Sequence, residues 1–187
     1  ASSTHPGEDE IILEALQTVL ETHSDALLIL VPRHTDRAAD IAGLITGANL
    51  RLTQRSLGQD PASDAEVYLA DTLGETGLWY ALAPITCLCG SFSKVGGHNP
   101  FEPAQGGSAI LHGPHYANFS QVYAEFDAAG AAREVSDAKA LSDAVLHLMD
   151  DDTARHALAD HAKTLSHAQD KGLDDIARDL SKALDLG

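Results

Sequence analysis

The chain has 187 residues, of which 28 are acidic and 12 basic, so its formal net charge at pH 7 is −16. This length is enough for one domain with a sizeable core, and an acidic chain without a Lys/Arg cluster is a poor partner for nucleic acid or anionic lipid. No apolar run approaches the length of a membrane span and no signal-peptide pattern is present, so we expect a soluble domain that does not insert into a membrane.

Helix and strand patterns alternate along the chain. Helices are expected at 8–20, 38–45, 74–82 and 119–126, and three more close the chain, carried by Leu141, Val145 and Leu148, by Leu158, Ala162 and Leu165, and by Ile176, Leu180 and Leu184. Strands are expected at 27–31, 50–53, 67–70, 85–89, 109–111 and 131–135, with a loop at 54–64. The strand before the first helix is expected upstream of Ala1. This alternation predicts an α/β fold with a Rossmann-like, doubly wound parallel sheet, forming a single domain over residues 1–187.

Polar motifs follow the expected strands at the points where those strands end. In open α/β sheets, ligands bind beyond the carboxyl ends of the strands. The motifs are therefore expected to converge on one edge of the sheet. They comprise Arg33 and His34, Asp71 and Thr72, residues 91–99, residues 112–115 and, before the first helix, residues 3–7.

The stretch 90–107, GSFSKVGGHNPFEPAQGG, follows a buried apolar strand and leads towards a helix start. Glycines let the backbone approach a ligand closely, and free amide groups at a helix start attract anions. This arrangement predicts a site for a phosphorylated or otherwise anionic ligand. Lys94 is a weak candidate for neutralising the charge of that ligand.

Five collinear motifs resemble the C-terminal half of the 3-deoxy-D-manno-octulosonic acid (Kdo) transferases. They are STHPGE at 3–8, VPRH at 31–34, DTLGE at 71–75, GGHNPFEPA at 96–104, and GPH at 113–115 with NF at 118–119. The similarity runs in order from the first residue to about Arg178. The resemblance implies a membrane-associated glycosyltransferase of lipopolysaccharide synthesis with two Rossmann-like domains in the GT-B arrangement, of which this chain is one.

By this resemblance the whole enzyme transfers Kdo from CMP-Kdo to a lipid A precursor and releases CMP, at the cytoplasmic face of the bacterial inner membrane. The chain then corresponds to the donor-binding half, which binds CMP-Kdo and CMP. In the family the general base, the membrane contacts and the acceptor groove belong to the N-terminal domain. The chain begins near the expected domain junction, so we expect no transferase activity from it in isolation.

The resemblance also implies roles for single residues. Glu102 would accept hydrogen bonds from the ribose hydroxyls, because a carboxylate accepts two hydroxyl hydrogens at once. Arg33 and the amides of 91–99 would bind the phosphate and stabilise its charge as CMP departs. The full set of donor-binding candidates is Ser3, Thr4, Arg33, His34, Thr72, Gly74, Glu75, Ser91, Gly96, Gly97, His98, Asn99 and Glu102.

Simpler interpretations stay open for several candidates. Asp71 and Thr72 are good helix N-caps, and Glu75 and Glu102 are also first-turn carboxylates of the kind that a helix dipole favours. His34 is as well explained by a hydrogen bond to a backbone carbonyl, and Arg33 by an ordinary surface position.

Other chemistries are poorly supported. His98, His112 and His115 lie near the expected site, but no H-x₃-H or HExxH spacing appears, so we expect no metal. The glycines match neither G-x-G-x-x-G nor a P-loop, and no G-x-S-x-G elbow exists, so we expect no cofactor and no nucleophilic serine. Cys87 and Cys89 are expected to be buried thiols, which suit a reducing cytoplasm. The alternative functions are another GT-B-like sugar-nucleotide enzyme, such as a 2-epimerase or another glycosyltransferase, and a non-catalytic nucleotide-binding module.

Overall fold

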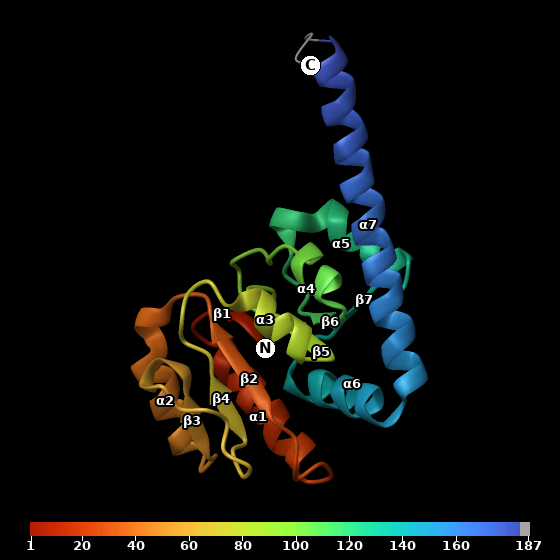
Figure 1. Cartoon of the computed structure of the whole chain (residues 1–187). Coiled ribbons are helices and arrows are strands. Elements are labelled where there is room, and N and C mark those ends of the chain that lie inside the picture. Colours follow the sequence, from red (N-terminus) through yellow and green to blue (C-terminus); the bar gives the residue numbers. More distant parts are fainter. Residues whose placement is uncertain (184–187) are drawn as a thin grey trace.

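A seven-stranded parallel sheet organises the chain, with the strand order β3-β4-β2-β1-β5-β6-β7 and helices on both faces (Figure 1). The computed structural model describes the backbone of residues 1–183 and the side chains of residues 1–168. The predicted α/β doubly wound architecture is confirmed.

The strands are β1 (Ser2–Thr4), β2 (Leu28–Pro32), β3 (Leu52–Gln54), β4 (Val67–Leu69), β5 (Ile85–Leu88), β6 (Ala109–His112) and β7 (Ala132–Glu134). The α-helices are α1 (Glu8–Leu20), α2 (Ala38–Gly47), α3 (Thr76–Leu82), α4 (Phe101–Gly106), α5 (Ser120–Ala128), α6 (Ala138–Asp150) and α7 (Asp152–Ala183). Short 3₁₀ turns are η1 (Thr35–Arg37), η2 (Arg55–Leu57) and η3 (Ala117–Phe119).

The direction in which the chain builds the sheet reverses between β1 and β5. From β1 the chain adds β2, β3 and β4 on one side, and α3 then carries it back across the sheet to β5, from which β6 and β7 continue on the other side. Strands β1 and β5 are paired neighbours, so their carboxyl ends form the topological switch point, where doubly wound sheets bind their ligands.

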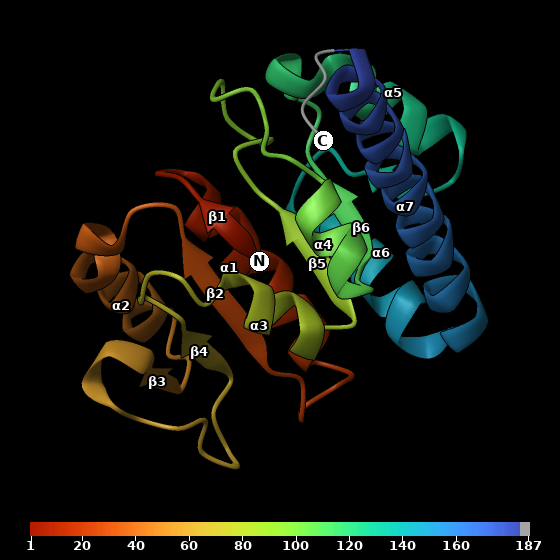
Figure 2. The same cartoon turned by 45° about the horizontal axis from the view of Figure 1, so that its top comes forward.

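Apolar side chains from the strands pack against helices on both faces of the sheet. One cluster joins α1 and α6 to β5 and β6, and another joins α1 and α2 to β2 and β4. Helices α3 and α4 pack together in front of the sheet, and α4 also contacts α7, which runs past β6 (Figure 2). Cys87, in β5, and Cys89, just beyond its end, are free, buried thiols that both pack in the first of these clusters.

Two expectations about the elements were wrong. The strand before the first helix lies within the chain, as β1: it is only three residues long and polar, so it lacks the apolar run that marks a buried strand. The last two predicted helices are one helix, α7, because only Gly172 weakens the segment between them, and one glycine costs a helix about 1 kcal/mol without ending it. Ile176 and Leu180 lie in α7, outside the described side chains, and Leu184 lies outside the described residues altogether. Among the described helices, none is both long and apolar enough to cross a membrane.

Candidate functional site

The loops that leave the carboxyl ends of β1, β2, β4, β5 and β6 form one rim of the sheet, and the predicted site residues lie on these loops and on the helix starts beyond them. We call this edge the rim. The convergence expected from the strand pattern is therefore present in the structure. What each side chain does there depends on its own contacts.

Glu8, the first residue of α1, holds the loop after β1 to the loop after β5. Its side chain is almost fully buried, with only 1% of the residue exposed. One carboxylate oxygen accepts hydrogen bonds from the backbone amides of His5, at 3.0 Å, and Gly90, at 2.7 Å, and the other accepts from the amide of Phe92, at 2.9 Å. A carboxylate is suited to this position because it offers only acceptors. Glu8 thus joins the two sides of the topological switch point.

Ser91 joins the loop after β5 to the loop after β6. Its hydroxyl is fully buried, donates to the carbonyl of Leu88 and accepts from the amide of Gly113, both at 2.7 Å. The carbonyl of Ser91 accepts from the amide of His115 at 2.8 Å. The hydroxyl predicted to lie at the ligand is therefore engaged within the protein, and its contacts position the two loops.

Gly96 and Gly97 pack against the segment that follows β6. Both have positive φ, 100° and 80°. A Cβ on Gly96 would lie 2.7 Å from the side-chain amide of Asn118, and one on Gly97 would lie 3.0 Å from the Cα of Tyr116. The close contact between the loop after β5 and the loop after β6 is therefore enough to explain glycine at both positions, without a ligand. Asn99 is exposed, and its side-chain oxygen accepts from the amide of Phe101 at 3.1 Å, at the start of α4.

Three histidines meet at the switch point. The Nε2 atoms of His5 and His98 are 2.9 Å apart, and their rings are stacked, with centroids 5.2 Å apart and planes 11° from parallel. His34 lies edge-on to His5, at 5.9 Å between centroids. Burial lowers the pKa of His5 and of His98, and the neighbouring cationic groups lower it further. No group of three or more His, Cys, Asp or Glu side chains in the described part of the chain is arranged to hold a metal ion.

Arg33 and Arg37, on the segment after β2, have different environments. Arg33 is exposed, and no described residue forms a hydrogen bond or ion pair with its guanidinium, although its amide donates to the carbonyl of Thr4 at 3.1 Å. Arg37 donates to the same carbonyl and pairs with the buried carboxylate of Asp9. Thr4 is fully buried, so its side chain faces the interior, whereas Ser3 is half-buried and has a positive φ of 59°. Arg33 is thus the cation at this part of the rim whose charge is free to meet an anion.

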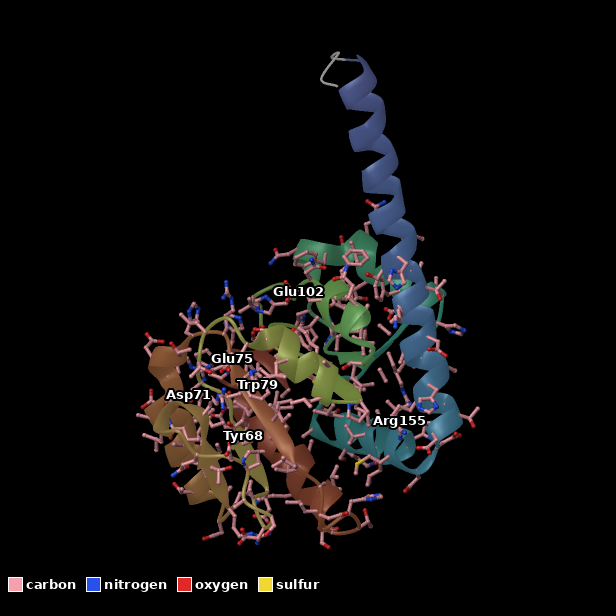
Figure 3. All side chains as sticks on the ribbon, viewed as in Figure 1. Tyr68, Asp71, Glu75, Trp79, Glu102 and Arg155 are labelled. Atoms are coloured by element: carbon pink, nitrogen blue, oxygen red, sulfur yellow. The ribbon has the colours of Figure 1, made fainter. Side chains whose placement is uncertain are left out.

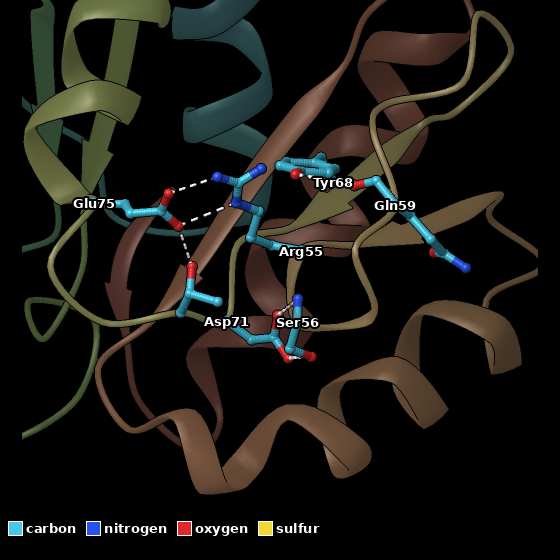
Figure 4. A network of polar contacts seen from close by, with 7 residues as sticks. Arg55, Ser56, Gln59, Tyr68, Asp71 and Glu75 are labelled. Carbon is cyan, nitrogen blue, oxygen red and sulfur yellow. Dashed lines mark hydrogen bonds and ion pairs between the residues drawn. The ribbon is translucent and has the colours of Figure 1, made fainter.

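The carboxylates after β4 bind residues 54–56, and the hydroxyl of Tyr68 donates to the carbonyl of Gln59 (Figure 4). Glu75 forms hydrogen bonds with the guanidinium of Arg55 and with the hydroxyl of Thr72, and Arg55 in particular lowers the pKa of Glu75 to about 2. Asp71 accepts from Ser56 and Gln54; burial opposes its charge, but these hydrogen bonds outweigh burial and lower its pKa.

Helix α3 has no side-chain cap, so the interpretation of Asp71 and Thr72 as its caps is wrong. The side chains of Thr72 and Glu75 bind each other, and Glu75 also binds Arg55, so both side chains stabilise the loop conformation at the rim.

A cleft between α3 and α4 contains Glu102. It measures about 540 Å³ and is lined by Gly74, Thr76, Gly77, Tyr80, Glu102, Gln105 and Gly106. Glu102 is exposed in the first turn of α4, and Figure 3 shows it at the upper end of that helix. Tyr80 is buried and its hydroxyl lies 2.8 Å from the hydroxyl of Ser2; burial first, and the charge of Glu102 in addition, raise its pKa to about 12. Gly74 and Glu102, both predicted as donor-binding residues, thus share one cleft.

No protein-family model matches the chain. Among curated proteins, it is similar to the 3-deoxy-D-manno-octulosonic acid transferases of Bordetella pertussis and Haemophilus influenzae, with 36% identity to each over 174 and 159 residues. These matches cover 89% and 84% of this chain but 40% and 37% of the two relatives, so the chain spans less than half the length of either.

Among solved structures, the chain is similar to the C-terminal CMP-Kdo binding domain of WaaA from Acinetobacter baumannii. The two are 35% identical with a TM-score of 0.83, over 87% of this chain and 85% of the other. The chain belongs to the Kdo transferase family. The resemblance found in the sequence is thereby confirmed. The C-terminal domain of the group 1 glycosyl transferase LpcC from Francisella tularensis, 16% identical with a TM-score of 0.57, shares the fold alone.

In this Kdo transferase domain, two charged side chains matter more than the sequence indicated. Neither Glu8 nor Arg37 was among the predicted donor-binding residues. The signal that could have found both is position: Glu8 lies within the STHPGE motif, and Arg37 lies three residues after VPRH. Neither spacing reveals that Glu8 accepts three backbone amides or that Arg37 has a buried acidic partner, because those contacts form between segments distant in sequence.

Proposed function

We propose that this chain is the donor-binding half of a Kdo transferase and that it binds CMP-Kdo, and CMP after transfer, at the rim. The observation that carries the proposal is the likeness, at 35% identity and a TM-score of 0.83, to a solved domain described as binding CMP-Kdo. The position of the motifs supports it, because they gather at the edge where doubly wound sheets bind nucleotides.

The nucleoside is assigned to the cleft between α3 and α4. Glu102 is exposed there, beside glycines that leave room for a ribose, and a carboxylate accepts hydrogen bonds from two neighbouring hydroxyls. Arg33, whose guanidinium forms no hydrogen bond or ion pair with a described residue, is assigned to the phosphate or to the sugar carboxylate. The other candidates on the rim loops act mainly by holding these loops in place, since the contacts described for them are with other protein groups. They are Ser91, Gly96, Gly97, Asn99, Thr72 and Glu75.

In the reaction, Kdo leaves CMP through an oxocarbenium-like transition state while negative charge grows on the departing phosphate. Donors already fixed in position stabilise such a charge without reorganising. The domain would contribute this stabilisation through Arg33 and the backbone amides of the loop after β5. We assign the acceptor, a lipid A precursor, and the general base to the remainder of the enzyme, and place that enzyme in a GT-B arrangement at the cytoplasmic face of the inner membrane.

Calorimetric titration with CMP and UMP tests the proposal. We expect weak binding of CMP, because one domain supplies about half of the contacts, and weaker binding of UMP. The substitution Glu102→Gln should reduce the affinity for CMP by about 1–3 kcal/mol, because a charge-assisted acceptor is lost. Glu125→Gln, which changes an exposed carboxylate on α5, is the matched control and should leave binding unchanged.

A ligand without ribose hydroxyls separates the role of Glu102 from a general charge effect. Wild type should bind 2′,3′-dideoxy-CMP less tightly than CMP, and Glu102→Gln should hardly distinguish the two. Equal binding of both ligands by wild type would refute the ribose assignment. No heat at millimolar CMP, with a folded protein, would refute the proposed function itself.

A further inference from the structure

The His5–His98 pair joins the two loops of the topological switch point by a hydrogen bond between imidazoles. His5 follows β1 and His98 lies in the loop after β5, and their Nε2 atoms are 2.9 Å apart. Such a contact requires one nitrogen to donate and the other to accept. If both rings carried a hydrogen on Nε2, the two N–H groups would face each other, so the contact excludes full protonation of the pair.

The charged groups around the pair are mostly positive. Arg33 and His34, from the segment after β2, lie close enough to disfavour a charge on either ring, and Arg37 disfavours one on His5. Glu8 of α1 is the acidic group that favours a charge on both. The carboxylate of Glu8 is already bonded to three backbone amides. The pair is therefore a group of weakly basic imidazoles, half-buried, beside a cation without a described partner, Arg33.

An oxyanion at this place would reverse the balance of charge. A negative charge within about 4–6 Å of an imidazole favours its protonated form. With a hydrogen on the Nε2 atom of each ring, so that one ring is an imidazolium and the other stays neutral, each could donate from Nε2 to the oxyanion instead of to its neighbour, and Arg33 lies on the adjacent strand end to complete the site. Taking up one proton would thus replace the hydrogen bond between the two imidazoles by two Nε2–H donors directed at one ligand.

We propose that His5 and His98 form an oxyanion subsite of the donor site, and that an oxyanion enters it together with one proton taken from solvent. The inference rests on the proposed function, whose ligand offers two oxyanions, the phosphodiester and the carboxylate of the sugar. It assigns to the pair a role in holding charge on the donor, distinct from the ribose contact of Glu102. Binding at this subsite strengthens as the pH falls towards 6.

Calorimetry in buffers of different ionisation enthalpy counts the protons taken up. Cytidine 5′-(methyl phosphate) is the first probe, because this phosphodiester does not titrate near neutral pH, whereas the second ionisation of CMP does. Free Kdo is the second probe, and cytidine is the neutral reference. We expect an uptake approaching one proton per ligand at pH 7.5 with one of the two anionic probes, which identifies the oxyanion bound, and none with cytidine.

Two histidine variants provide the matched comparison. His5→Gln should abolish the uptake and lower the affinity for the anionic probe five- to twentyfold at pH 6.5, whereas His156→Gln, at an exposed position on α7 outside the rim, should behave like wild type. Binding of both anionic probes without uptake, as when one ring merely changes tautomer, would overturn the inference and leave the proposed function intact. Equal uptake in His5→Gln would also overturn it. If no cytidine ligand binds at all, the proposed function fails, and this inference with it.

A second measurement uses the wild-type protein and so does not depend on the folding of a variant. The imidazole carbon resonances of His5 and His98, followed by NMR against pH, should titrate at higher pH when the bound anionic probe is present than when it is absent. Unchanged titration of both rings in the saturated complex would contradict the proposal.

Discussion

Replacing Glu8 by Gln tests whether one buried carboxylate holds the rim together. Glu8 accepts three backbone hydrogen bonds, two on one oxygen and one on the other. The side-chain oxygen of Gln can still accept hydrogen bonds from the backbone amides of His5 and Gly90. Its NH₂ group then faces the backbone amide of Phe92, so that two donors meet. Losing one charge-assisted bond and leaving buried donors unsatisfied costs about 2–4 kcal/mol of unfolding free energy.

Urea denaturation followed by circular dichroism measures this loss. With an m-value of about 2 kcal/mol/M, the midpoint should fall by about 1–2 M while m stays unchanged. Glu10→Gln is the control: Glu10 is also in the first turn of α1 but is exposed, so it contributes only the dipole effect of about 0.3–1 kcal/mol. If the two substitutions cost the same, the bonds from Glu8 to the rim loops contribute no net stability and the reasoning is wrong.

Two further predictions concern other parts of the rim. Gly97→Ala should destabilise the fold by about 1–3 kcal/mol more than Gly107→Ala. Both glycines have φ near 80°, but only the methyl group at position 97 would press on the backbone of Tyr116. Equal losses of unfolding free energy in urea denaturation would show that the loops separate easily. The pKa of Glu75 is lowered to about 2 by Arg55, so its stabilising effect is complete above pH 4.5 and is lost as the pH falls towards 2. Stability measured over this range should therefore fall more steeply in wild type than in Glu75→Gln, and parallel curves would count against the pair.

The fold was largely readable from the sequence because its strands are short apolar runs between helix-length segments. The exception, β1, is polar, and it lies in the sheet because its backbone pairs with β2 and β5 on either side. Backbone pairing of this kind leaves no pattern in the side chains. The joining of two predicted helices into α7 has a similar cause, since a single glycine in a polar stretch looks like a break but need not be one.

The convergence of the motifs on one edge of the sheet was also predictable, but the contacts of their side chains were not. Arg33 and Glu102 lie exposed at the rim, as the motifs indicated. Ser91 and Glu75 instead bind other protein groups, because a loop that is to present a ligand site must first satisfy its own buried polar groups. The His5–His98 contact joins residues 93 positions apart, which spacing along the chain cannot indicate.

The central claim, that the rim of this domain binds the nucleotide of CMP-Kdo, is tested most directly by an amide NMR titration with CMP. The account predicts that the resonances that shift belong to the rim, above all to Gly74, Gly77, His98 and Glu102. An apolar cavity of about 330 Å³ at the opposite end of β2 and β5, lined by Leu28, Ile85 and Val145 among others, serves as the internal reference and should not respond. Shifts confined to that cavity, or none at millimolar CMP, would contradict the account.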